Sequence, residues 1–64
     1  MTINSEMYMK CLQIEALVKT SVLSGIHDYE SLVDIVDINF HPNNKDEMEA
    51  YSEAIIYAKF GILN

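Results

Sequence analysis

Residues 5–23 read SEMYMKCLQIEALVKTSVL, and the spacing of their apolar side chains predicts an α-helix with two apolar faces. At about 100° per residue, the first apolar face consists of Met7, Cys11, Ile14, Val18 and Val22. The second apolar face lies roughly 135° away and consists of Tyr8, Met9, Leu12, Ala16 and Leu23. A surface helix needs only one such face for its own core. We therefore expect another protein surface, either a second copy or a different partner, to cover the second face.

Local signals mark both ends of this helix, which we expect to run from about Ser5 to Leu23. Asn4 is a candidate N-cap, and Glu6 in the first turn suits the positive end of the helix dipole. Gly25 is predicted to end the helix, because glycine readily adopts the left-handed conformation found there.

A second long helix is predicted after Pro42, which discourages helix in the residue before it. Asn44 is the candidate N-cap, and Glu47 three residues later completes an asparagine variant of the capping box. Lys59 suits the last turn, and Gly61 is expected to stop the helix. Apolar residues at helical spacing form its expected core stripe: Met48, Tyr51, Ile55 and Ala58.

The segment between them, residues 28–40, fits either a helix or a strand. As a helix capped by Asp28, it aligns Tyr29, Val33, Val36 and Phe40, and Leu32 and Ile35 widen that face. As a strand, its β-branched residues alternate with polar ones. A lone strand between helices would have no pairing partner for its backbone, so helix is the prediction. The expected fold is thus all-α, one small domain over residues 1–64, with two longer helices flanking a shorter one.

The length of 64 residues makes such a domain only marginally stable on its own. The single cysteine cannot form an internal disulfide, and no metal-binding cluster is visible. Association is the remaining source of additional burial, so we expect a helical homodimer.

The charge balance limits the classes of partner. Ten acidic residues against four lysines, with no arginine, give a formal net charge of −6. Nucleic acids and anionic membranes should repel such a chain. There is no secretory signal pattern and no apolar run long enough to cross a membrane, and a lone thiol suits a reducing compartment, so we expect a cytoplasmic protein.

Carboxylates form two columns at helical spacing. The first carboxylate column is Glu30, Asp34 and Asp37, and the second is Asp46, Glu49 and Glu53. Like charges at these spacings slightly destabilise a helix. The columns therefore indicate either a solvated polar face or a surface for a basic partner, and a row of carboxylates could also imitate DNA phosphates. Tyr57 and Phe60 project beside the second column, as in an interface with an acidic rim.

The sequence contains no pattern that indicates a catalytic or metal site. Neither His27 nor His41 belongs to a recognised metal-ligand spacing, and Cys11 lies on the first apolar face without a neighbouring cation. No nucleotide-binding, zinc or nucleophile motif is present, so we expect neither a cofactor nor an enzyme.

The sequence thus favours a small acidic interaction module that regulates or inhibits another protein. The alternatives are a self-assembling structural oligomer and a DNA-mimicking inhibitor. The residues expected to contact the partner are Tyr8, Met9, Leu12 and Ala16 through apolar contacts and Glu30, Asp34 and Asp37 through charge.

Overall fold

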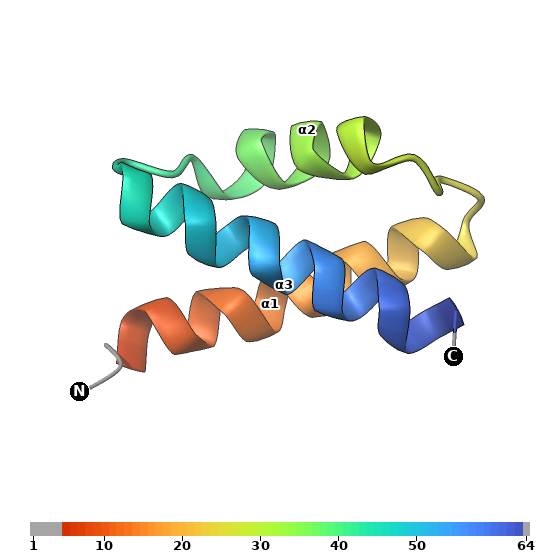
Figure 1. Cartoon of the computed structure of the whole chain (residues 1–64), viewed down its shortest axis with the longest axis horizontal. Helices are drawn as coiled ribbons and strands as arrows, with labels where there is room; N and C mark the ends of the chain where they lie inside the picture. Colours follow the sequence, from red (N-terminus) through yellow and green to blue (C-terminus); the bar gives the residue numbers. More distant parts are fainter. Residues whose placement is uncertain (1–4, 64) are drawn as a thin grey trace.

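The computed structural model describes residues 5–63, and the side chains of residues 5–61. These residues form three helices, α1 (Ser5–Leu23), α2 (Tyr29–Phe40) and α3 (Lys45–Leu63), and contain no strand. The all-α prediction, with two longer helices flanking a shorter one, is therefore confirmed. Figure 1 shows that α2 returns the chain, so that α1 and α3 run in the same direction.

The end of α1 is closed by backbone hydrogen bonds around Gly25. Gly25 has a φ of 107°, a conformation that a side chain disfavours. The amide of Ile26 donates to the carbonyl of Ser21 and that of Gly25 donates to Val22, both at 3.0 Å. This is the Schellman arrangement that the glycine predicted. The candidate N-cap Asn4 lies outside the described residues.

Side-chain and backbone caps also define α2. The carboxylate of Asp28 accepts a hydrogen bond from the amide of Ser31 at 3.0 Å, which confirms the predicted N-cap. At the other end, His41 adopts a left-handed conformation with φ 46°, and its amide donates to the carbonyl of Asp37 at 3.0 Å. Pro42 follows and cannot continue the helix.

The start of α3 contains the predicted capping pair in a slightly displaced form. The side chain of Asn44 accepts from the amide of Glu47 at 2.9 Å, as expected. The Glu47 carboxylate reaches back to the amide of Asn43, also at 2.9 Å, instead of that of Asn44. Both bonds satisfy amides near the helix start that have no partner within the helix.

The predicted stop at Gly61 is wrong, because α3 continues through it to Leu63. Glycine permits a left-handed turn but does not require one, and Ile62 and Leu63 are compatible with helix. Because the helix is longer than predicted, Lys59 precedes its last turn, which contains no basic residue.

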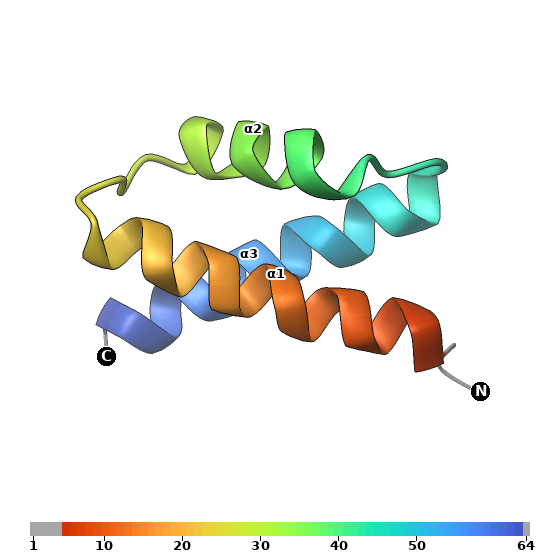
Figure 2. The same cartoon turned by 180° about the vertical axis from the view of Figure 1, so that it is seen from behind.

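The core lies where the three helices meet, and α1 and α3 make the most extensive contact (Figure 2). The nine core residues are buried hydrophobic side chains: Ile14, Val18 and Val22 of α1, Leu32 and Val36 of α2, and Tyr51, Ala54, Ile55 and Ala58 of α3. The buried hydroxyl of Ser21 donates to the carbonyl of Leu17 at 2.9 Å, so this polar group is satisfied.

Two expectations about buried faces need correction. Met48 is 57% exposed, because it lies in the first turn of α3, one turn before the first buried residue, Tyr51. On α2 the buried face centres on Leu32 and Val36, and Tyr29 at the helix start is 39% exposed. An apolar stripe is buried only where another element lies over it, and helical spacing alone does not reveal how far that cover extends.

Candidate functional site

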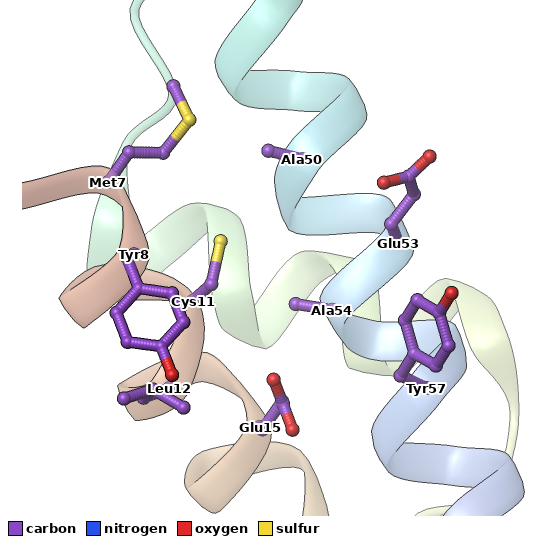
Figure 3. A pocket seen from close by; sticks show the side chains of 9 residues that line it. All are labelled: Met7, Tyr8, Cys11, Leu12, Glu15, Ala50, Glu53, Ala54 and Tyr57. Carbon is purple, nitrogen blue, oxygen red and sulfur yellow. The ribbon is translucent and has the colours of Figure 1, made fainter. Parts of the chain in front are cut away.

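An apolar groove with a volume of about 450 Å³ lies between α1 and α3 (Figure 3). Its walls come from residues at helical spacing on both helices. They are Met7, Tyr8, Cys11, Leu12 and Glu15 of α1 and Ala50, Glu53, Ala54 and Tyr57 of α3. Several of these side chains are large, apolar and exposed, among them Tyr8, Leu12 and Tyr57.

The groove exists because α1 has a second apolar face beside its core face. Ile14, Val18 and Val22 of the first face are buried, whereas Tyr8 is 53% and Leu12 42% exposed. Within residues 5–61, the structure thus confirms that the second apolar face is left exposed while the first is buried at these three positions. Exposed apolar side chains in one contiguous place commonly mark an interaction surface.

Small side chains on α3 give the groove its depth. Ala50 and Ala54 lie between the helices together with Cys11. Tyr57 of α3 lies across the groove from Tyr8 of α1 and is 72% exposed (Figure 3). Ala50 is half-buried, so a larger side chain at this position would fill the space, whereas Ala54 is also part of the core.

The predicted apolar contact residues divide between the groove and its surroundings. Tyr8 and Leu12 line it, whereas Met9 and Ala16 are exposed on α1 but are not part of its walls. Met9 is 54% exposed. These two residues can extend a contact beyond the groove but do not shape it.

Two carboxylates give the groove a negative potential. Glu15 projects from α1 and Glu53 from α3, and neither forms an ion pair within residues 5–61. Burial raises the pKa of the Cys11 thiol, and the nearby Glu15 and Glu53 carboxylates raise it further. The thiol therefore stays protonated at neutral pH and lacks the thiolate that a nucleophile needs.

The first carboxylate column, Glu30, Asp34 and Asp37, is exposed but does not join this site. It belongs to α2, which lies behind the groove in Figure 3. The structure therefore separates the predicted apolar and charged contact residues. Spacing within one helix could not show this, because the separation depends on how α2 packs.

The second carboxylate column contributes one member, Glu53, to the groove. Asp46 and Glu49 are exposed elsewhere on α3, and Phe60 is 58% exposed one turn after Tyr57. The predicted proximity of aromatic residues and carboxylates thus holds at Tyr57 and Glu53, both of which line the groove.

Sequence reasoning missed the other groove residues for identifiable reasons. Met7 and Cys11 fall on the first apolar face and were expected in the core, but at this end of α1 they are only half-buried. Ala50 and Ala54 do not belong to the predicted core stripe of the third helix, so they were not singled out. Their spacing of four residues, on a helix packed against α1, is the signal that could have found them.

The histidines lie apart from the groove. His27 and His41 are both exposed. Within the part of the chain that the structure describes, no group of three His, Cys, Asp or Glu side chains could hold a metal ion.

No protein family model matches the sequence, and neither a curated protein nor a solved structure was found to be similar to it. None of the three described helices is long and apolar enough to cross a membrane.

Proposed function

We propose that this protein is a non-enzymatic interaction module, a small acidic regulator or inhibitor that binds another protein through the groove between α1 and α3. The observation that carries the proposal is the exposure of apolar side chains along that groove, among them Leu12 and Tyr57. Covering them with a partner would remove apolar surface from water, which is the main favourable term in protein association.

The electrostatics support a protein partner over a nucleic acid. The net charge of −6 and the absence of arginine disfavour contact with phosphates. The groove itself contains Glu15 and Glu53 but no lysine. A polar rim around an apolar centre is common in protein interfaces, and charges in the rim set specificity more than affinity.

A comparative capture experiment tests the proposal. The full-length chain is immobilised as wild type, as the groove variant Leu12→Ser/Tyr57→Ser, and as the control variant Ile38→Ser. Ile38 is 69% exposed on α2, so the control also removes exposed apolar surface but leaves the groove intact. We expect one protein from the native host to bind the wild type and the Ile38→Ser control in equal amounts and to be lost from the groove variant.

Sedimentation of the purified chain at micromolar concentration completes the test. A tight dimer that is disrupted by the groove variant would mean that a second copy occupies the groove, in favour of a self-assembling structural protein. Retention of the same host protein by the groove variant would refute the proposed site.

A further inference from the structure

The shape of the groove between α1 and α3 suits a helix as its occupant. Ala50 and Ala54 are one turn apart on α3, so a helix of another protein can approach the α3 backbone closely there (Figure 3). Glu53 and Tyr57 complete the i, i+3, i+4, i+7 pattern of a helix that packs against another along its length. Such grooves between two helices accept the apolar face of an amphipathic helix.

The packing of α2 leaves this side of α1 and α3 open. Leu32 and Val36 fill the core from α2, which lies behind the groove in the view of Figure 3. A helix seated in the groove would cover the outer side of the same two helices. It would complete a four-helix arrangement and bury Leu12 and Tyr8, which are 42% and 53% exposed.

The charges of the groove define the chemistry of that helix. Glu15 and Glu53 belong to opposite walls, and neither has an ion-pair partner among the described side chains. Lys19 lies one turn after Glu15 but forms no ion pair with it, and Lys10 lines a separate polar hollow with Glu6 and Glu47. A helix with Lys or Arg on both flanks of its apolar face would meet a carboxylate on each wall.

A second copy of this chain fits the groove poorly. Two grooves facing each other would bring the Glu15 and Glu53 carboxylates of both copies together, and each copy has a net charge of −6. Like charges placed opposite one another suppress an association. The charge pattern therefore favours a foreign, basic partner over self-association at this face.

We propose that the groove binds one amphipathic α-helix of another protein, with its apolar side chains against Leu12, Ala50 and Ala54 and its Lys or Arg side chains paired with Glu15 and Glu53. This inference rests on the proposed function and names the class of partner.

Designed peptides test the inference without knowledge of the natural partner. The probe is an amphipathic peptide of about 18 residues, ~27 Å long as a helix, with Leu at positions i, i+3, i+4 and i+7 and Lys on both flanks. The molecule is 34 Å long, so the probe fits within its length. One reference peptide has Glu in place of every Lys. The other has the same amino acids as the probe in a scrambled order, so that it has no apolar face. Binding to the full-length chain is followed by amide NMR shifts and by titration calorimetry.

The expected result is binding of the basic amphipathic peptide at least about tenfold tighter than either reference. The largest shifts should occur at Cys11, Leu12, Ala50 and Ala54. The Glu15→Gln/Glu53→Gln variant should bind it about fivefold more weakly and with less dependence on salt. The control variant Asp34→Asn/Asp37→Asn removes the same charge from exposed positions on α2 and should leave the affinity unchanged.

Several outcomes would overturn the inference. These are equal binding of the acidic peptide, shifts confined to the α2 carboxylates, no shift in the groove at millimolar peptide, or a dimer that occupies the groove. If the capture experiment still shows a host protein that depends on Leu12 and Tyr57, the interaction function stands and only the basic helical partner is wrong.

Discussion

The hydroxyl of Tyr51 is the one buried side-chain oxygen or nitrogen in the described residues without a hydrogen-bond partner. The ring is only 2% exposed and packs edge-on against Phe40, with centroids 6.4 Å apart. Burial is also the main reason why the pKa of Tyr51 is raised. The core therefore benefits from the ring of this tyrosine, while its hydroxyl loses hydration without compensation.

The substitution Tyr51→Phe should raise the free energy of unfolding by about 1 kcal/mol, because it removes the hydroxyl that lacks a hydrogen-bond partner and keeps the ring. Urea denaturation followed by circular dichroism measures the change. Tyr57→Phe is the matched control, since Tyr57 is 72% exposed and its hydroxyl remains hydrated, so its unfolding midpoint should not move. A clear loss of stability in Tyr51→Phe would show that this hydroxyl has a hydrogen-bond partner in solution.

Because of Asp28, the stability that the N-cap of α2 contributes should depend on pH. The hydrogen bonds with Ser31 lower the pKa of Asp28 below its usual 3.8. A carboxyl with a lowered pKa stabilises the fold above its unfolded-state pKa, and that contribution is lost as pH falls through the folded-state pKa. We expect Asp28→Ala to lower the urea midpoint at pH 7, and the difference from wild type to shrink below about pH 4. Asp28→Asn keeps a capping oxygen but does not titrate, so its stability should lack this step. An equal deficit of Asp28→Ala at pH 7 and pH 3 would contradict the prediction.

At the scale of elements, the two glycines differ in backbone conformation. Gly25 has a φ of 107°, whereas Gly61 lies within α3, and a Cβ atom at either position would meet no atom within 4 Å. Conformation alone thus distinguishes them. Gly25→Ala should destabilise the fold by about 1 kcal/mol, and Gly61→Ala should stabilise it by about 0.5 kcal/mol because alanine favours helix. Thermal unfolding of both variants checks the pair. Effects of the same sign would contradict it.

Most helix ends could be predicted from the sequence because the signals that define them are local. The caps at Asp28, Gly25 and Asn44 act within a few residues, so they could be recognised without a fold. The end of α3 could not, because Gly61 permits two conformations and nothing nearby selects one. The exposure of Met48 depends on where the neighbouring helices end, and the spacing of residues within one helix cannot predict this.

At the scale of the whole molecule, the groove was predictable only in part. The two apolar faces of residues 5–23 correctly indicated an uncovered surface containing Tyr8 and Leu12. Its second wall, with Ala50 and Ala54, follows from the packing of α3 beside α1. The distance between the groove and the α2 carboxylates is likewise a property of the assembled helices.

The excess of negative charge should make the stability of the whole molecule depend on salt. At low ionic strength of about 0.01 M, charges interact over about 30 Å, which is most of the 34 Å length of the molecule. With ten acidic residues against four basic ones, the summed interaction is repulsive. We therefore expect the melting temperature to rise by several degrees between 0.01 M and 0.3 M NaCl, measured by circular dichroism at low-micromolar concentration.

A charge-reduced variant gives this prediction its control. Glu30→Gln/Asp34→Asn/Asp37→Asn removes three exposed carboxylates from α2 and with them the like-charge pairs at helical spacing. Relief of about 0.2–0.5 kcal/mol per pair should raise the low-salt melting temperature by a few degrees. The same variant should then gain less from added salt than the wild type. If salt left the wild type unchanged, or raised both proteins equally, repulsion among the carboxylates would not be what limits the stability of this fold.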